Sequence, residues 1–194
     1  MRTRRRGGAD ERRQKISGIS TFISFPTLVT IIALTLVTAC SSQEQDRDYA
    51  VPDSLCGTSV NAEEITPFLP AGKSIEVTKE EHYATEICKV VVDETLILTA
   101  TQAWVGQGKT TAYFASGQTL ETPKLSAESG RYRFSGNEGF GKTRSCVDRE
   151  HKQELYVALQ FQGSKHSDSD AIEQLVTAYT EKVEDSSACT AGAQ

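Results

Sequence analysis

The stretch Glu86-Ile-Cys-Lys-Val-Val-Val-Asp-Glu-Thr-Leu-Ile-Leu-Thr-Ala-Thr-Gln-Ala-Trp104 decides the fold of this 194-residue chain. Two runs rich in apolar and β-branched residues, Glu86–Val92 and Thr95–Trp104, flank the polar pair Asp93-Glu94. Such runs on either side of two turn-forming residues predict a tight antiparallel hairpin. In the second run Leu96, Leu98 and Ala100 share one face with Trp104, so we expect that face to be buried.

Further strands are expected on both sides of this hairpin. The expected segments are Ile75–Lys79, Arg131–Ser135 and Glu154–Gln162. The last of them places Leu155, Val157, Leu159 and Phe161 on one face, as a half-buried strand does. Thr111–Ser116 fits either a strand or a single helical turn.

Two helices are expected at the ends of this region. Asn61–Leu69 begins with a capping residue and has two glutamates in its first turn. The segment Ala171–Glu184 follows an acidic cap and repeats apolar residues at helical spacing, at Ile172, Leu175, Val176, Tyr179 and Val183. The pattern predicts a single α+β domain, in which a curved antiparallel sheet is covered by a C-terminal helix and a short N-terminal helix.

The charge of the chain is divided unevenly between its two ends. The formal net charge is -5, but residues 1–39 hold seven basic and two acidic side chains, and the remainder holds 14 basic and 24 acidic ones. An acidic body with a basic head excludes a nucleic-acid binder driven by overall charge. Between Lys15 and Glu44 no charged residue occurs. A positive segment followed by an apolar segment is typical of a secretory signal peptide.

Val37-Thr38-Ala39-Cys40 resembles a bacterial lipobox, in which a peptidase cuts before a lipid-modified cysteine. We therefore expect residues 1–39 to be a lipoprotein signal peptide, with Cys40 the lipidated residue. An uncleaved transmembrane anchor is the alternative, since the uncharged segment is long enough to span a bilayer. Residues 40–53 are mostly polar and predict a flexible tether, which leaves residues 54–194 as the extracytoplasmic α+β domain.

The remaining cysteines are Cys56, Cys88, Cys146 and Cys189. Four cysteines in an exported domain favour two disulfides, for which there are three possible connectivities. We expect sequence neighbours to pair, as Cys56–Cys88 and Cys146–Cys189. A zinc site is disfavoured, because no Cys-x-x-Cys spacing occurs and the three histidines are not clustered with the cysteines.

Two segments satisfy a phosphate-binding loop pattern. Gly136-Asn-Glu-Gly-Phe-Gly-Lys-Thr143 fits it fully, and Ala103–Thr110 fits a looser form. A true P-loop joins a buried strand to a long helix in a parallel sheet. That context is missing here, and Val90–Asp93, the possible magnesium-binding strand, belongs to the hairpin. We therefore interpret both segments as glycine-rich turns between antiparallel strands.

The other candidate catalytic residues are isolated in the sequence. Ser145 has no Gly-x-Ser-x-Gly elbow around it. His82 and His151 lie in charged runs that predict exposed loops, and His166 precedes aspartates that are best explained as helix caps. Trp104 is expected in the core or at its rim. No catalytic residue, cofactor or metal is therefore assigned.

Seven residues carry a resemblance to a known group. Cys56-Gly57, Cys88, Asp93, Trp104, Cys146 and Cys189 follow the layout of small secreted actinobacterial lipoproteins, several families of which have no assigned activity. The resemblance implies a compact antiparallel sheet covered by helices, and it supplies no catalytic residue.

These observations predict a protein on the outer face of the cytoplasmic membrane, attached through Cys40 to membrane lipid. A non-enzymatic binding or accessory module of the cell envelope is the leading expectation, with a small molecule or an envelope protein as its partner and no nucleic acid. A divergent cell-envelope hydrolase and a purely structural envelope protein are the alternatives.

Overall fold

A computed structural model describes residues 47–119 and 122–191 of the chain. The expected signal peptide of residues 1–39 and the lipidation site Cys40 lie outside the described residues. The strands are β1 (Ser54–Leu55), β2 (Thr58–Ser59), β3 (Ile75–His82), β4 (Thr85–Val92), β5 (Thr95–Gly106), β6 (Leu125–Ala127), β7 (Tyr132–Phe134), β8 (Glu138–Asp148) and β9 (Gln153–Gln160). The helices are α1 (Ala62–Ile65), α2 (Thr111–Ser116), α3 (Ser169–Glu184) and α4 (Ser187–Ala191), with short 3₁₀ turns η1 (Thr66–Phe68) and η2 (Glu128–Gly130).

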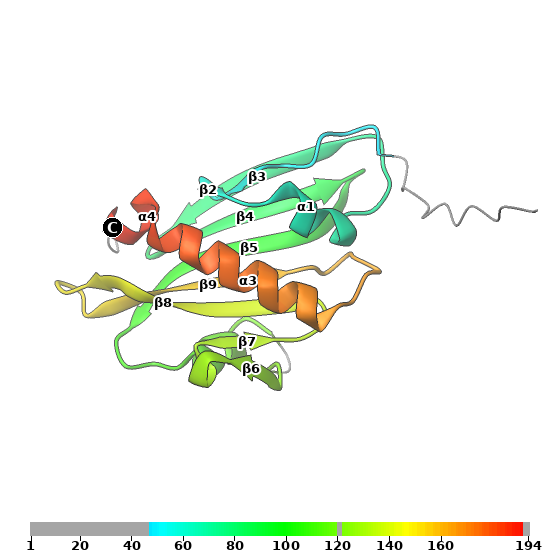
Figure 1. Ribbon diagram of the computed structural model, residues 1–194. Helices are drawn as coiled ribbons and strands as arrows, with labels where there is room; N and C mark the ends of the chain where they lie inside the picture. Colours follow the sequence, from blue (N-terminus) through cyan, green and yellow to red (C-terminus); the bar gives the residue numbers. More distant parts are fainter. Residues whose placement is uncertain (1–46, 120–121, 192–194) are drawn as a thin grey trace, which may run out of the picture. The chain divides into compact units, whose positions relative to one another are not determined.

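Seven strands form one antiparallel sheet in the order β3-β4-β5-β9-β8-β7-β6 (Figure 1). The short strands β1 and β2 form a separate two-stranded ribbon. The α+β class, the antiparallel sheet and the presence of two disulfides are thereby confirmed.

The expected hairpin joins β4 to β5 through the two residues Asp93 and Glu94. Both have positive φ, at 45° and 66°, as the favoured two-residue hairpin turns require. The Asp93 carboxylate accepts hydrogen bonds from the backbone N–H groups of Lys73 and Ser74, which lowers the pKa of Asp93. The turn therefore also fastens the segment that leads into β3.

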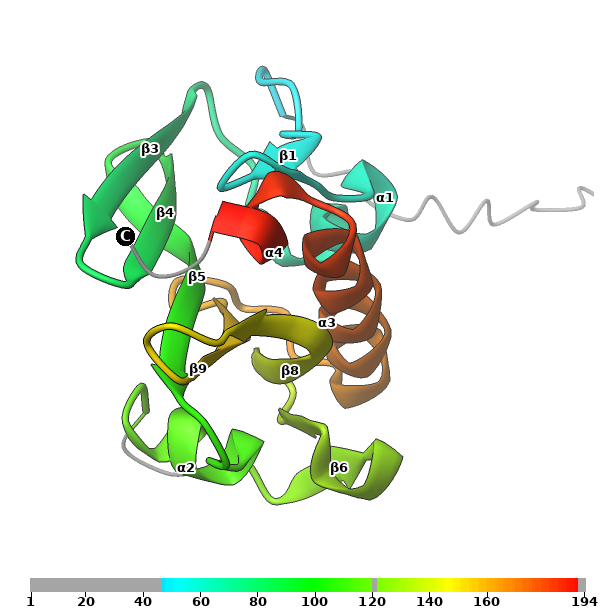
Figure 2. The same cartoon turned by 90° about the vertical axis from the view of Figure 1, so that its left-hand side faces the viewer.

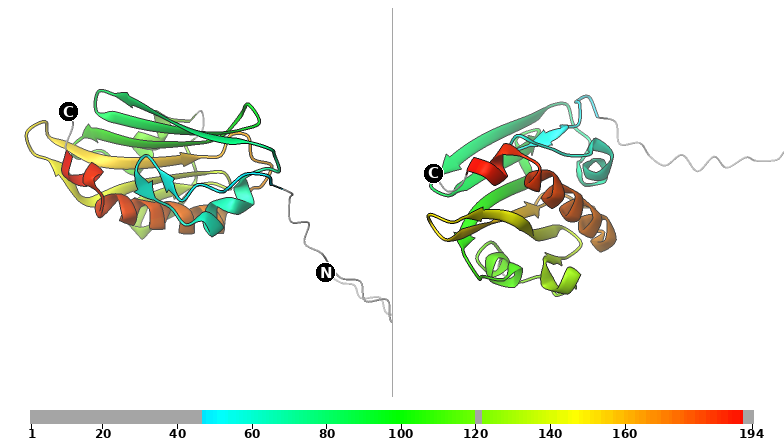
Figure 3. Two further views of the ribbon diagram at one scale, coloured as in Figure 1. Left: turned by 90° about the horizontal axis from the view of Figure 1, so that it is seen from above. Right: turned by 60° about the vertical axis from the view of Figure 1, so that its left-hand side comes forward.

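The long helix α3 lies along one face of the sheet, here called the inner face (Figure 2). Its capping residue is Asp168, whose side chain accepts hydrogen bonds from the N–H groups of Asp170 and Ala171. The expected apolar stripe from Ile172 to Val183 is buried against the sheet. Figure 3 shows that α1 lies on the same side of the sheet as α3. The inner face therefore holds the main core.

The first P-loop-like segment is not a turn, as the sequence predicted, but largely strand β8. Its glycines lie where α3 approaches the sheet most closely. A Cβ atom on Gly139 would come within 2.8 Å of Val176, and one on Gly141 within 2.2 Å of Thr180 Oγ1. A Cβ on Gly136 would come within 2.0 Å of Ser167 Oγ, just before the helix. All three glycines of the pattern therefore make room for α3 and its cap.

The two disulfides pair sequence neighbours, Cys56 with Cys88 and Cys146 with Cys189. The first joins the β1–β2 ribbon to β4, and the second joins β8 to α4. The first closes a loop of 32 residues and the second a loop of 43 residues. Loops of that length stabilise a fold by about 4 kcal/mol each in the chain-entropy treatment.

A buried tyrosine links three elements of the inner face. The Tyr179 hydroxyl on α3 donates to the carbonyl of Leu55 and accepts from Gln102 on β5, each at 3.0 Å. Gln102 also donates to the hydroxyl of Thr58 at 3.0 Å. Burial raises the pKa of Tyr179 to about 12, so the hydroxyl stays protonated and keeps donating.

Residues 47–53, expected as part of the tether, pack against the domain instead. Arg47 forms a β-bridge with Gly72, and its guanidinium donates to the carbonyls of Thr66 and Leu69. The Tyr49 hydroxyl donates to the Pro70 carbonyl. The folded unit therefore includes Arg47, and only residues 40–46 of the expected tether lie outside the described residues.

Other boundaries differ in smaller ways from the sequence expectations. Strand β3 extends to His82, so this histidine ends a strand rather than lying in a loop. The segment Thr111–Ser116 is helical, and β6 and η2 were not expected. The expected helix Asn61–Leu69 is divided into α1 and η1. Pro67 lies in η1, where its ring and missing N–H end the α-helical bonding.

The close approach of α3 to β8 generates a test. We expect Gly141→Ala to lower the free energy of unfolding by about 2 kcal/mol, because the new methyl group has no space beside Thr180. Gly106→Ala is the matched control, since nothing lies within 4 Å of a Cβ at that position. Chemical denaturation measures both.

Adding Thr180→Ala to Gly141→Ala removes the obstructing hydroxyl and should restore part of the loss. Equal stability of the Gly141→Ala and Gly106→Ala variants would contradict this account of the glycines.

Candidate functional site

The face of the sheet opposite α3, here called the outer face, carries a second, smaller apolar cluster. It consists of Ala103, Phe114, Ala115, Phe140, Tyr156 and Ala158. Tyr156 and Ala158 alternate along β9 with residues that face α3, so they point to the other side. Phe114 on α2 packs against Tyr156 and Phe140, with ring centroids 5.2 and 6.1 Å apart. Helix α2 is therefore seated on the outer face by aromatic contacts.

Hydrogen bonds fix the first turn of α2. The Thr110 hydroxyl caps it by accepting from the Tyr113 N–H at 3.1 Å. The Thr111 hydroxyl donates to the Arg131 carbonyl, and the Tyr156 hydroxyl donates to the carbonyl of Lys109. These bonds come from β9 and from the segment before β7, so the position of α2 depends on distant parts of the chain.

An ion pair lies beneath the loop that leads into α2. Lys142 Nζ lies 2.7 Å from a carboxylate oxygen of Glu154, which also accepts from the Gly108 N–H at 2.9 Å. Partial burial is the largest single influence and opposes both charges, but the mutual hydrogen bond, the further hydrogen bonds with Tyr156 and Gly108, and the attraction between the charges together outweigh it. The pKa of Lys142 is therefore raised and that of Glu154 is lowered. This lysine, the one in the P-loop pattern, thus holds the loop at Gly108.

A cleft of about 380 Å³ lies between α2 and the adjoining ends of β4 and β5. Its lining residues are Thr85, Ala103, Trp104, Val105, Tyr113, Phe114, Ser116, Gly117 and Gln118. This volume is in the usual range for small-molecule sites. The lining offers aromatic and aliphatic surface together with neutral hydroxyl and amide groups. Such a surface suits an uncharged ligand that has both an apolar part and hydrogen-bonding groups.

The exposed ring of Tyr113 gives this cleft its character, whereas the indole of Trp104 lies on the inner face of the sheet. Tyr113 is 55% exposed, although the next residue, Phe114, packs α2 onto the sheet. Lys109 Nζ lies 4.6 Å from the ring centroid of Tyr113. Trp104, the single tryptophan of the chain, is partly buried and packs against the main core. It therefore has the rim position that the sequence predicted. The cleft itself was missed, and its only sequence signal was the threonine cap before Tyr113.

The P-loop pattern does not form a phosphate-binding loop in the structure. Thr143, which would bind magnesium in that motif, is buried and donates its hydroxyl to the Leu155 carbonyl at 2.8 Å. The second segment, Ala103–Thr110, covers the end of β5 and the loop to α2. Both belong to an antiparallel sheet, and α2, which follows the second segment, has only six residues, whereas the motif requires a parallel sheet and a long helix.

The three histidines lie on different elements. His82 ends β3, with its Nε2 3.8 Å from Glu80. His151 lies in the β8–β9 turn, with its Nδ1 2.7 Å from Asp148. The ring of His166 meets that of Phe68 edge-on at 4.9 Å between centroids. The structure therefore does not bring them together, and Asp168 serves as the cap of α3.

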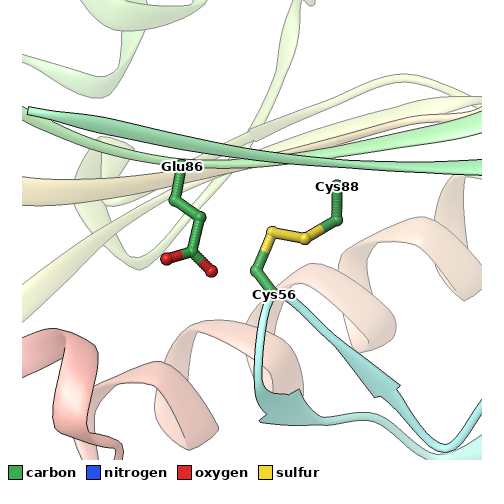
Figure 4. A group of neighbouring side chains, drawn as sticks. All are labelled: Cys56, Glu86 and Cys88. Carbon is green, nitrogen blue, oxygen red and sulfur yellow. A yellow bond between two sulfur atoms is a disulfide. The ribbon is translucent and has the colours of Figure 1, made fainter. Parts of the chain in front are cut away.

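Glu86 lies beside the first disulfide, with its oxygen and both sulfur atoms within 4.8 Å of one another (Figure 4). The two sulfurs are bonded to each other, so they are not thiolate ligands for a metal. The Glu86 carboxylate also forms an ion pair, with its Oε2 2.9 Å from Lys79 Nζ. The group is best described as a disulfide with a neighbouring ion pair.

Comparison with known proteins finds no matching family model, no matching curated protein and no matching solved structure. Within residues 47–119 and 122–191, no helix is both long enough and apolar enough to cross a membrane.

The His151–Asp148 pair gives a prediction on pH. Its hydrogen bond raises the pKa of His151, so the pair stabilises the turn fully below the ordinary histidine pKa of about 6.5. That contribution is lost as the pH rises through the raised folded-state pKa. We expect an NMR titration to give His151 a pKa above 6.5, and we expect Asp148→Asn to lower that pKa. Glu150→Gln is the control and should change the pKa of His151 less. A larger change with Glu150→Gln than with Asp148→Asn would refute the role of Asp148.

Proposed function

We propose that the chain is a lipid-anchored extracytoplasmic protein whose domain binds a small uncharged ligand in the cleft beside α2. The observation that carries the binding role is the cleft itself, with its aromatic surface and neutral polar groups. Binding sites for small molecules are concave and mostly apolar, with a few polar groups that fix orientation. The exposed ring of Tyr113 and the neighbouring hydroxyl and amide groups of Thr85 and Gln118 provide both parts.

The cleft is supported by rigid contacts rather than by a mobile loop. The capped turn of α2, its aromatic seat and the Lys142–Glu154 pair hold one wall against the sheet that forms the other. A preformed wall reduces the entropy that a ligand must lose on binding. This supports a binding role more than a structural one, for which no such cleft is needed.

The membrane attachment is proposed from the sequence. A basic head, an apolar segment and Val37-Thr38-Ala39-Cys40 support lipidation at Cys40 and a position on the outer face of the cytoplasmic membrane. The two disulfides within the described residues support an oxidising compartment. The partners are then membrane lipid through Cys40 and the ligand of the cleft.

The cleft can be tested with a neutral probe. Phenyl β-glucoside, which has one aromatic ring and several hydroxyls, should bind saturably in calorimetry and shift the amide NMR signals of Tyr113 and Gln118, which line the cleft. We expect Tyr113→Ala to weaken this binding about fivefold, the size of one aromatic contact.

Tyr83→Ala is the matched control, because Tyr83 is a 72% exposed tyrosine that does not line the cleft. Binding unchanged by Tyr113→Ala, or equally weakened by Tyr83→Ala, would rule out this site.

The anchor is tested by the mass of the mature protein. We expect a chain that begins at Cys40 and carries added lipid, and a Cys40→Ala variant that lacks this lipid and stays unprocessed. Cys40 takes part in neither disulfide, so the domain should keep its fold in the variant. An unmodified mature protein that begins at Met1 would refute the anchor.

A further inference from the structure

A second concave site lies on the same molecule, between the end of β5 and the β8–β9 hairpin. Its volume is about 600 Å³, and its lining residues are Gln107, Ser145, Val147, Arg149 and Lys152. We call it the basic groove, because two of these five residues are cationic and none is acidic. None of the five lines the cleft beside α2.

The cations of the basic groove are available for an external anion. Among residues 47–119 and 122–191, neither Arg149 nor Lys152 makes an ion pair. By contrast, Lys142 and Arg144 on the adjoining strand are paired with carboxylates at 2.7 and 2.8 Å.

The acidic side chains nearest in sequence have partners or lie outside the lining. The Asp148 carboxylate accepts hydrogen bonds from the backbone N–H groups of the turn and lies against the His151 ring. Glu154 forms an ion pair with Lys142. Glu150, in the same turn, is not among the residues that line the groove. No carboxylate therefore lines the groove to neutralise Arg149 and Lys152 there.

The walls of the basic groove are fixed by a large irregularity in β8. The β8–β9 register moves from Lys142 opposite Tyr156 to Val147 opposite Glu154, so the segment 143–146 bulges out of the ladder. Two buried anchors hold this bulge, namely the Thr143 hydroxyl bond to Leu155 and the disulfide at Cys146. Ser145, between these anchors, is exposed at the groove.

The opposite wall is fixed to the hairpin by a backbone bond. The N–H of Gln107 donates to the carbonyl of Lys152 at 2.8 Å, which ties the end of β5 to the turn. Lys152 has a positive φ of 55°, the conformation that closes the turn. Within the described part of the chain, the side chains of Gln107 and Ser145 make no hydrogen bond to protein, so their amide and hydroxyl are available as donors.

We propose that the basic groove binds an anionic group, a phosphate or a carboxylate, on a soluble ligand. The guanidinium of Arg149 suits a planar or tetrahedral oxyanion through two parallel hydrogen bonds, and the ammonium of Lys152 adds a point charge. The hydroxyl of Ser145 and the amide of Gln107 supply neutral donors on the same concave surface.

The place of the groove in the fold favours a soluble anion over a lipid headgroup, and this part of the inference rests on the proposed anchor. Arg47 joins the domain at Gly72, beside the Asp93 end of β5, whereas Gln107 follows the other end. The 12 residues of β5 span about 36 Å. The groove therefore lies at the opposite end of β5 from Arg47, the described residue nearest in sequence to Cys40.

The experiment measures binding of tripolyphosphate to the full-length protein in neutral detergent micelles, by calorimetry and by amide NMR shifts. We expect saturable binding with shifts at Ser145 and Lys152, and an Arg149→Ala/Lys152→Ala variant to bind at least tenfold more weakly. Lys124→Ala/Lys165→Ala is the matched control, since it removes the same charge at exposed positions outside the groove. Equal weakening in both variants would show attraction by overall charge alone and overturn the site.

Two further measurements separate the remaining outcomes. Ser145→Ala should weaken tripolyphosphate binding about threefold without changing the net charge. This single variant still tests the groove if the double variant fails to fold. Cosedimentation with vesicles of anionic phosphatidylglycerol should be the same for the groove variant and the control. Vesicle binding lost only in the groove variant would instead assign the groove to headgroups. The cleft test with Tyr113 uses a neutral probe, so its failure is distinguishable from failure here.

Discussion

The fold depends on how closely α3 approaches β8. A helix packed on a sheet is normally held off by the side chains of both, but here Gly139 and Gly141 present bare backbone to the helix. Val176 and Thr180 therefore lie almost directly on the strand. That approach lets Tyr179, one turn along, reach both Gln102 on β5 and the carbonyl of Leu55. The helix, the sheet and the N-terminal ribbon are thus joined around one buried hydroxyl.

The sequence predicted those parts of the fold in which local pattern and tertiary role agree. The β4–β5 hairpin was recognisable because Asp93-Glu94 separates two apolar runs, and α3 because its cap and its stripe point the same way. Strand β8 was missed for a physical reason. Its glycines remove the alternating side chains by which a strand is recognised, and glycine in isolation favours turns. Only the position of α3 explains why Gly139 and Gly141 are needed in a strand.

The two concave sites were not predictable, because each depends on contacts between distant segments. The cleft needs α2 to be placed by Phe140 and Tyr156, which follow it in the chain by more than twenty residues. The basic groove needs the bulge before Cys146, which arises from the register of β8 against β9. The same lysine that made Gly136–Thr143 resemble a P-loop is used to support the loop at Gly108. A motif of this kind has chemical meaning only once its strand order is known.

The disulfide arrangement has a consequence for how the protein matures. The loop from Cys56 to Cys88 is complete before the loop from Cys146 to Cys189 begins, so the two neither overlap nor nest. Under the proposed export, in which the domain crosses the membrane from its N-terminal end, the four cysteines of the domain emerge in the order in which they pair. With Cys40 lipidated as proposed, oxidation of Cys56 with Cys88 and then of Cys146 with Cys189 produces the native bonds directly. Such a domain has little need of a disulfide isomerase. An enzyme that only forms disulfide bonds suffices for its maturation.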